Sequence, residues 1–353
     1  MNPNDLIIHP LDIAETLPSN WYSDPEIAKL EKDKIFSNEW LLIGSASQLK
    51  NPGDTLNIST IDNHIIIVKQ TDNELKAFYN ICRHRAGRLV REKSCLKRIQ
   101  CSYHGWIYNL DGTLKNAREF DDTKNFDFNE HNLVSIYLET WKGLIFINFS
   151  KNPSPINKFL DAINKRIHPT DFSRYSYHSR ISYNIKCNWK VYMDNFLEGY
   201  HIPFVHPGLN KLVNYKSYKT ELFDTFSLQW CPIDNEKSPY GDANKNHSFA
   251  YYFTIFPNIL LNITPGRLQT NIIEPTSPNT CIVHFDYYFE NSNTSIDSDL
   301  EFSESVQQED ILICEEVQLG LESTAYDTGR FSVKSEAGVH HFQSLFKKRI
   351  SDG

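Results

Sequence analysis

The spacing of apolar and polar residues predicts a helix near the start of the chain. Asp24 is a suitable N-cap, Pro25 fits the first helical position, and apolar residues recur with helical spacing up to Ile35. From residue 39 to about 149 the pattern changes to short β-rich runs separated by turn signals. We therefore predict a helix over 24–36 and, after it, an all-β module.

The second half of the chain mixes strand and helix patterns. The segment 151–155 contains two prolines and reads as a linker between domains. Asn188 is a suitable cap for a helix from Trp189 to about His201, and a last helix is expected from about Ser303 to Leu321. Apolar or alternating runs predict strands at 65–68, 181–185, 249–256, 260–263 and 281–289. The pattern indicates an all-β module followed by an α+β domain.

Composition limits the classes of function. The chain has 353 residues, enough for about two domains, and its net charge of −8 argues against a general binder of nucleic acid or anionic membranes. No apolar run approaches the roughly 20 residues that span a bilayer, and the start does not resemble a signal peptide. Seven cysteines, an odd number, disfavour a disulfide framework, so we expect a cytoplasmic protein whose Cys–His pairs bind metal.

Two Cys–His pairs form the first metal motif. Cys82 and His84 are followed, after sixteen residues, by Cys101 and His104. Thiolates bind soft iron, and two Cys with two His is the ligand set of a Rieske [2Fe–2S] cluster. The alternative is a structural zinc site, but zinc fingers usually order their ligands Cys, Cys, His, His, whereas here each loop carries one of each.

The surroundings of this motif carry two further expectations. Cys95 lies between the loops with no obvious partner, and we expect a small buried apolar residue there. Basic residues crowd the same stretch, which favours docking of an acidic electron donor over a merely solvated loop. They are Arg83, Arg85, Arg88, Arg91, Lys93, Lys97 and Arg98.

The second motif places two histidines near the end of the helix predicted from Trp189. We expect Pro203 to end that helix near His201, so that His206 returns on the following turn and both imidazoles bind one ion. On the helical pattern, Asp194, Glu198 and His201 share one face, opposite a stripe of Trp189, Met193, Phe196 and Tyr200. Such a polar face also suits simple exposure to water.

A carboxylate on the last predicted helix completes this second set. Asp310 falls on an apolar stripe, where an unpaired carboxylate would cost several kcal/mol unless a metal or a buried cation neutralised it. The adjacent Glu309 projects elsewhere on the pattern and is the weaker candidate. Two His and one carboxylate form the facial triad of non-haem Fe(II) oxygenases. The stripe consists of Val306, Asp310, Ile313, Val317 and Leu321.

Over nearly its whole length the sequence resembles the oxygenase α component of the Rieske non-haem iron oxygenases. The motifs that carry the resemblance are Cys82-x-His84, Cys101-x-x-His104-Gly-Trp, Asn188-Trp189-Lys190, Asn195-x-x-Glu198-x-x-His201-x4-His206 and the Glu309-Asp310 helix. The resemblance implies an α+β protein with an all-β Rieske domain and a helix-grip (Bet v 1-like) catalytic domain, in which a curved antiparallel sheet wraps a long helix. We expect an N-terminal arm over 1–38 packed on the catalytic domain, the Rieske domain over 39–150 and the catalytic domain over 151–353.

The resemblance also implies roles for residues and partners. Cys82, His84, Cys101 and His104 would hold the [2Fe–2S] cluster, and His201, His206 and Asp310 the mononuclear Fe(II). Glu198, where most members have Asp, would bridge His201 to the cluster ligand of a neighbouring subunit in a homotrimer, and Asn195 belongs to the same catalytic motif. NADH electrons would arrive through a flavin reductase, with or without a ferredoxin. The expected reaction is hydroxylation, dihydroxylation or oxidative demethylation with O2.

For the substrate, the Glu variant and the C-terminal tail are similar to the choline, carnitine and betaine monooxygenase branch. A quaternary ammonium group needs an aromatic box, because cations are attracted to π faces. Trp230, Tyr252, Phe256 and Tyr288 are candidates, although aromatic residues at strand spacing are often core. The alternatives are an aromatic or heteroaromatic acid as substrate and, as a non-enzyme, a Rieske electron carrier, which would leave the second domain unexplained.

Overall fold

The computed structural model describes residues 2–168, 170, 172, 175–213, 217–233, 249–290 and 296–352. The chain forms two compact units, one made of Met1–Glu39 with Ser154–Gly353 and the other of Trp40–Pro153. Among the described helices, none combines the length and the apolar character that crossing a membrane requires.

The unit Trp40–Pro153 is built from antiparallel strands. Its larger sheet has six strands in the order β1-β9-β8-β4-β3-β2, and a smaller one has the order β5-β6-β7. The predicted strand at 65–68 lies at the centre of β3, where all four side chains are fully buried. The strands are β1 Leu41–Ser45, β2 Thr55–Thr60, β3 Asn63–Lys69, β4 Leu75–Tyr79, β5 Ile99–Gln100, β6 Ile107–Tyr108, β7 Leu114–Asn116, β8 Ser135–Trp141 and β9 Leu144–Asn148.

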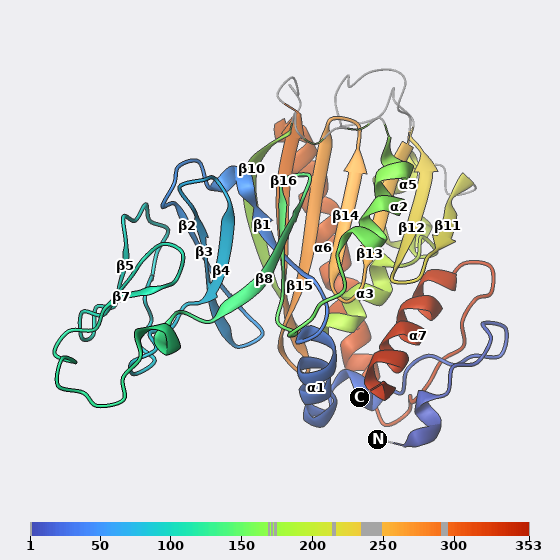
Figure 1. The fold of residues 1–353 in the computed structure, drawn as a ribbon. Coiled ribbons are helices and arrows are strands. Elements are labelled where there is room, and N and C mark those ends of the chain that lie inside the picture. Colours follow the sequence, from blue (N-terminus) through green and yellow to red (C-terminus); the bar gives the residue numbers. More distant parts are fainter. Residues whose placement is uncertain are drawn as a thin grey trace. The chain divides into compact units, whose positions relative to one another are not determined.

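The larger unit contains a seven-stranded antiparallel sheet in the order β10-β16-β15-β14-β13-β12-β11. Strands β11 to β16 follow one another as hairpins, and β10 joins the end of the sheet by pairing with β16. Figure 1 shows the long helix α6 running along this sheet. The strands are β10 Tyr175–Ile185, β11 Lys219–Leu222, β12 Phe226–Pro232, β13 Phe249–Ile255, β14 Ile259–Thr264, β15 Arg267–Ser277 and β16 Thr280–Glu290. An all-β unit and an α+β unit rich in antiparallel sheet agree with the predicted fold class.

Seven α-helices are described in the larger unit. They are α1 Pro25–Leu30, α2 Asn157–Ile167, α3 Trp189–Phe196, α4 Ile202–Val205, α5 Leu209–Leu212, α6 Ile296–Leu321 and α7 Ala337–Ser351. The helix predicted over 24–36 is present, with Asp24 capping the Glu26 amide, but its second half is a π-helical turn over Glu31–Phe36. Thus the N-terminal helix was found from sequence, whereas its change of pitch was not.

The helix predicted from Trp189 to His201 is wrong at its end, because α3 stops at Phe196. The amide of Leu197 caps it by donating to the carbonyls of Met193 and Asp194. A second short helix, α4, then begins at Ile202 with Pro203 in its first turn. Proline is tolerated there, because the first-turn amides have no intrahelical partner to lose. The expected apolar stripe also fails at Tyr200, which is 52% exposed.

Helix α6 differs from its prediction in both length and burial. It begins at Ile296 instead of near Ser303, and Val317 on the expected buried stripe is 44% exposed. Its buried residues are polar or small: Asp299, Ser303, Gln307, Cys314 and Gln318. Such a face is stable only when its polar groups are hydrogen-bonded. The Ser303 hydroxyl donates to Gln269 of β15, and Gln307 accepts from the Tyr192 hydroxyl of α3.

A buried polar cluster fastens α3 to the N-terminal segment. The Trp189 indole donates to Glu31 at 2.8 Å, and the Lys190 ammonium pairs with the other oxygen of the same carboxylate. Lys190 is fully buried, so removing Glu31 alone would leave an uncompensated charge in the core. The pair therefore holds the helix that leads into the second histidine motif.

Candidate metal centres

The two Cys–His loops of the unit Trp40–Pro153 have the same backbone construction. Cys82 donates its amide to the Gly87 carbonyl and accepts at its own carbonyl from Ala86, and the segment from Cys101 to Trp106 repeats both bonds. Ala86 and Gly105 occupy equivalent positions and both have positive φ, at 54° and 76°. The two loops therefore present their donors as two matching turns.

The sulfur donors lie deepest. Both thiols are buried, Cys82 lies within hydrogen-bonding reach of Cys101, and the Tyr108 hydroxyl is 3.3 Å from the Cys82 sulfur. A Cβ at Gly87 would come 3.4 Å from the Cys101 sulfur, so the two loops lie within van der Waals contact here. The sulfur atoms therefore form one pair at the base of the loops.

The imidazoles form the other pair. The His84 and His104 rings have centroids 4.7 Å apart, and His84 stacks on Trp106 at 4.9 Å. His84 Nδ1 is buried, and no hydrogen-bond partner for it is present among the described residues. Burial, with the charges of His104 and Arg85, lowers the pKa of His84 and favours the neutral form that a metal requires. An unpartnered buried nitrogen in this position fits a metal ligand.

The spacing of these four donors bears on the zinc alternative. A tetrahedral zinc ion would bring all four to within about 4 Å of one another. Among the described residues, the donors that lie within 4.8 Å of one another in a group of three or more are those of the larger unit. The four loop donors do not form such a group. The loop donors thus form a sulfur pair and an imidazole pair, which suits a cluster with two iron atoms.

Cys95 does not behave as expected. It is exposed instead of buried, and its thiol lies 3.6 Å from the Pro52 carbonyl oxygen and close to Asp54. The reason is that the backbone of Cys95 pairs with Asp54 in an isolated antiparallel bridge, which leaves the Cys95 side chain at the surface.

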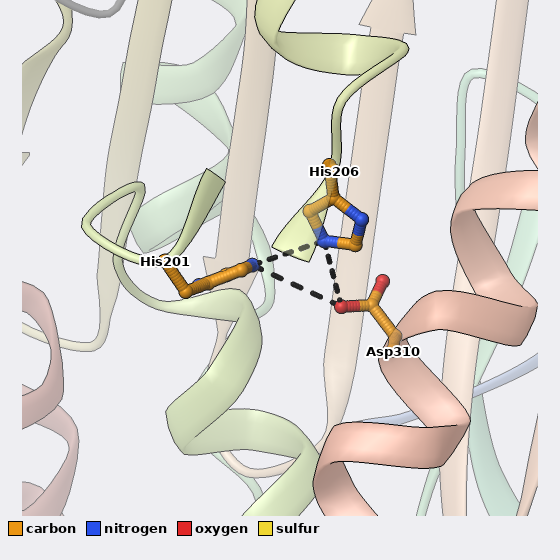
Figure 2. Close-up of side chains that lie close together, drawn as sticks. All are labelled: His201, His206 and Asp310. Atoms are coloured by element: carbon orange, nitrogen blue, oxygen red, sulfur yellow. Dashed lines mark hydrogen bonds and ion pairs between the residues drawn. The ribbon is translucent and has the colours of Figure 1, made fainter. Parts of the chain in front are cut away.

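In the larger unit, His201, His206 and Asp310 converge (Figure 2). The Nε2 atom of His206 lies 3.1 Å from His201 Nε2 and 3.1 Å from Asp310 Oδ1, and His201 Nε2 is 3.8 Å from the same oxygen. Ligand atoms about 2.1 Å from one ion and at right angles to each other lie about 3 Å apart. The geometry therefore suits one metal ion bound on one face by these three residues.

The break between α3 and α4 produces this convergence. His201 precedes α4 and His206 follows it, so the short helix turns the chain and directs both rings to one point (Figure 2). Asp310 comes from the middle of α6, and its carboxylate accepts from the Asn195 amide of α3 at 2.6 Å. Asn195, predicted as part of the catalytic motif, therefore orients the carboxylate of the triad.

Glu309 corrects one expectation from the sequence. It does not project elsewhere: its Oε2 atom lies 2.7 Å from His206 Nδ1. Burial lowers the pKa of His206, but hydrogen bonds and charge from Asp310 and Glu309 outweigh this effect and raise it. A carboxylate on the second nitrogen fixes the ring and its tautomer when the first nitrogen binds metal. The adjacent motif Glu309-Asp310 was the only available signal, and helical spacing gave no reason to join both residues to one site.

Glu198 supports the other histidine. Its Oε1 atom lies 2.5 Å from His201 Nδ1, and its Oε2 atom accepts from the amides of Tyr200 and His201. The carboxylate is thus held by its own loop, with its side chain 12% exposed. Both triad histidines therefore have a glutamate on the ring nitrogen that faces away from the other two ligands.

A cavity of about 110 Å³ opens beside the triad. Of the four aromatic residues proposed for substrate, Tyr252 lines it. Trp230, Phe256 and Tyr288 do not.

 The alternation of side chains along a strand explains the difference. Trp230 pairs across strands with Tyr251 on the opposite face from Tyr252, and Tyr288 contacts Tyr177 on the face of β16 opposite the cavity-lining Phe285. Phe256 lies beyond the end of β13 and packs against Phe342 of α7.

The walls of this cavity have an aromatic side and a polar side. Tyr218 and Tyr252 lie nearly parallel with centroids 6.5 Å apart, and Phe196 meets Tyr252 edge-on at 6.3 Å. The polar side includes Gln269 and Arg267, whose guanidinium pairs with the buried Asp299. Sequence reasoning missed Phe196 and Tyr218 as wall residues, because nothing in their local pattern separates a cavity wall from a core position.

A second cavity of about 320 Å³ lies on the other side of His201 and Glu198. Asp194 lines it and is partly buried, accepting from the Tyr22 hydroxyl at 2.6 Å and from the Gln343 amide at 3.0 Å. Burial raises the pKa of Asp194 to about 7, although these hydrogen bonds and Lys190 oppose the shift. The expected alternative, in which this face of the helix meets water, is therefore wrong for Asp194.

Comparison with known families agrees with this chemistry. Residues 39–127 match the Rieske [2Fe-2S] domain, and residues 172–352 match the ring hydroxylating alpha subunit (catalytic domain). A fold with these two domains in this order is that of an oxygenase with two iron centres.

Comparison with individual proteins shows which members of these families the chain resembles. The chain is 33% identical to choline monooxygenase, chloroplastic, of Arabidopsis thaliana, over 97% of this chain and 84% of the relative. It is 31% identical to the carnitine monooxygenase oxygenase subunit of Acinetobacter pittii (strain PHEA-2), over 97% and 96% of the two chains. The crystal structure of the quaternary ammonium Rieske monooxygenase CntA with L-carnitine superimposes with a TM-score of 0.86 at 27% identity, covering 98% of this chain and 99% of the other. The protein belongs to the Rieske non-haem iron oxygenase α-subunit family and is an oxidoreductase.

Proposed function

We propose that this chain is the terminal oxygenase of a system that hydroxylates or oxidatively demethylates a small quaternary ammonium compound. The observation that carries the proposal is the aromatic wall formed by Tyr218, Tyr252 and Phe196 in the cavity beside the triad. A cation within about 6 Å of an aromatic centroid is attracted by the π face, more strongly when water is excluded. The relatives named above, a choline monooxygenase and a carnitine monooxygenase subunit, support the same substrate class.

The donor sets define which residues would hold the two metal groups. Cys82, His84, Cys101 and His104 would hold the [2Fe–2S] cluster, since the sulfur pair, the imidazole pair and the unpartnered Nδ1 of His84 fit its ligand set. His201, His206 and Asp310 would hold the mononuclear Fe(II), which supplies open coordination positions for O2 chemistry.

The side chains around the triad would perform the positioning. Asn195 orients the Asp310 carboxylate, while Glu309 and Glu198 hold the outward-facing nitrogens of His206 and His201. Tyr218 and Tyr252 would bind the ammonium group through their ring faces and hold one carbon of the substrate near the triad. Orientation of this kind can lower a reaction barrier by several kcal/mol.

The proposal also covers how electrons reach the protein and how its subunits assemble. We expect NADH electrons to reach the cluster through a flavin reductase, with or without a ferredoxin, and the basic residues of the segment 83–98 suit docking of an acidic donor. Glu198 would connect His201 to His104 of a neighbouring subunit in a homotrimer. None of the seven cysteines, all of which the structure describes, forms a disulfide, which suits a reducing compartment such as the cytoplasm.

The experiment measures substrate-dependent consumption of NADH and O2 by the purified chain with a surrogate reductase. The panel sets choline, carnitine and betaines against benzoate-like acids. We expect only quaternary ammonium compounds to stimulate turnover with formation of an oxidised or demethylated product. Stimulation by a benzoate-like acid alone would establish the alternative substrate class instead.

Two variants connect the result to the aromatic wall. Replacing Tyr252 with Leu should raise KM for the active ammonium compound about tenfold, since a desolvated cation–π contact contributes about 1–2 kcal/mol. The matched control is Tyr251→Leu, the preceding residue on β13, whose ring lies 5.8 Å from the Arg166 guanidinium on the other face of the strand. Equal effects of both variants would contradict the role of Tyr252.

A further inference from the structure

Three cysteines from separate segments meet in the core of the larger unit. Cys187 follows β10, Cys281 lies in β16 and Cys314 lies in α6. The Cys187 and Cys281 sulfurs are 4.0 Å apart, and Cys314 is also hydrogen-bonded to Cys187. Exposure of the three side chains is 0–1%. Neither metal site uses these thiols.

The surroundings of Cys187 differ from those of an ordinary buried thiol. Its sulfur lies within hydrogen-bonding reach of the thiols of Cys281 and Cys314, and it accepts from the Tyr192 amide in the first turn of α3. These bonds lower the pKa of Cys187 despite burial. Cys231 provides the contrast, because burial alone raises the pKa of its thiol to about 12. Hydrogen-bond donors at a helix N-terminus are a typical setting for a reactive thiolate.

One member of this cluster borders a cavity that a small oxidant could enter. Cys314 lines the cavity of about 320 Å³ that also borders His201 and Glu198. Cys314 is one helical turn from the triad residue Asp310, on the same helix. Hydrogen peroxide, the two-electron reduction product of O2, is small enough to enter such a cavity and is formed when an oxygenase reduces O2 without oxidising its substrate.

We propose that Cys187 is a peroxide-reactive thiol and that Cys281 is its resolving partner. The Cys187 thiolate attacks one oxygen of hydrogen peroxide, the O–O bond breaks, and hydroxide leaves with a proton as water, which gives a sulfenic acid. The Cys281 sulfur then attacks the Cys187 sulfur, an S–S bond forms, and a second water leaves. In sum, two thiols and one hydrogen peroxide give one disulfide and two waters.

The bond would also change the triad. The sulfurs must move from 4.0 Å to about 2.05 Å apart. Cys187 directly precedes Asn188, the cap of α3, and α3 carries the Asn195 amide that orients Asp310. Closing the bond therefore displaces the start of α3, so the oxidised protein loses activity until a thiol reductant restores it. This part of the inference rests on the proposed function, whereas formation of the disulfide does not.

In the test, the purified holoprotein is treated with increasing hydrogen peroxide. The protein carries Cys95→Ala, which removes the exposed thiol. Free thiols are then alkylated under denaturing conditions and the peptides are mapped by mass spectrometry. We expect a peptide pair joined through Cys187 and Cys281, reversible with dithiothreitol, at a dose that leaves Cys231 fully alkylatable. Modification of Cys187 and Cys281 no faster than that of Cys231 would overturn the proposal.

Two variants assign the partner. Cys281→Ser should abolish the disulfide while leaving initial activity unchanged, and Cys281→Ala serves the same purpose if the hydroxyl destabilises the core. Cys314→Ser should retain the Cys187–Cys281 bond. A disulfide between Cys187 and Cys314 in the parent protein would refute Cys281 as the resolving residue. If peroxide inactivated Cys281→Ser as strongly as the parent protein, the proposed effect of the disulfide on the triad would be refuted.

Discussion

Two glutamates act on the triad through histidine nitrogens that do not face the metal position. Glu309 lies 2.7 Å from His206 Nδ1, and Glu198 lies 2.5 Å from His201 Nδ1. A carboxylate in this position raises the basicity of the imidazole and fixes its orientation. At the scale of single residues, we expect these two contacts to decide how well the triad can hold an ion.

Replacing Glu309 with Gln keeps an acceptor for His206 but removes the negative charge. We expect iron at the mononuclear site to be lost to a chelator at a 10–100-fold lower concentration, since loss of such a partner typically weakens metal binding by that factor. The measurement is iron retention against chelator concentration, with the visible spectrum of the cluster as an internal reference. Glu301→Gln, on an exposed turn of α6, is the control and should match the parent.

Asp194 makes stability depend on pH. Its pKa rises to about 7 in the folded protein, so the stability associated with its bound proton is complete below the ordinary value near 3.8 and is lost as the pH rises toward 7. At pH 8 the buried charge costs about 4 kcal/mol relative to an unshifted carboxyl. We expect Asp194→Asn to have a higher Tm than the parent at pH 8, with the difference shrinking toward pH 5.

Thermal unfolding across this pH range checks the expectation. The Asn side chain can still accept from Tyr22 and Gln343, so the hydrogen bonds to Asp194 are largely kept. Asp33→Asn, at an exposed ion pair with Lys29, is the control and should show no comparable trend. A Tm difference that is the same at pH 5 and pH 8 would exclude titration of Asp194 as its cause.

At the scale of elements, the end of α3 determines where His201 lies. Helix α7 packs against this end, where a Cβ on Gly338 would come 2.5 Å from the Leu197 carbonyl oxygen. The helix therefore approaches the α3 terminus more closely than any other residue type allows. The length of α3 was predicted wrongly because this contact, between residues about 140 positions apart, leaves no trace in the local pattern.

Gly338→Ala should therefore destabilise the protein, even though Ala favours helices by up to about 1 kcal/mol over Gly. Displacement of Leu197 would also disturb the loop that carries Glu198 and His201, so we expect lower turnover along with a lower Tm. Gly320→Ala in α6 is the matched control, because a Cβ there meets nothing within 4 Å. If Gly338→Ala were as stable as Gly320→Ala, close packing of α7 would not explain the position of α3.

At the scale of the whole molecule, two metal groups in separate units predict three iron atoms per chain. His206→Ala should keep two iron atoms and the visible spectrum of the cluster, because its side chain belongs only to the triad. Turnover should be abolished. Iron analysis, the visible spectrum and O2 consumption check these outcomes together, and turnover that survived in His206→Ala would disprove the proposed mononuclear site.

The sequence by itself determined the class of protein and predicted the main donors for two metal sites. The motifs around Cys82, Cys101 and His201 are short, so spacing along the chain already limits how their side chains can meet. The change from a β-rich first half to a mixed second half likewise predicted an all-β unit and an α+β unit, because the periodicity of side chains is a local property.

Tertiary structure alone decided the remaining features. Glu309 contacts the triad residue His206, and Tyr252 lines the cavity whereas Trp230 does not. Three cysteines meet around Cys187. All these features arise from contacts between distant segments. The buried face of α6 is polar because its partners on β15 are polar, which the helix's own sequence does not reveal. Local patterns record which side chains share a face, but only the packed fold determines what that face meets.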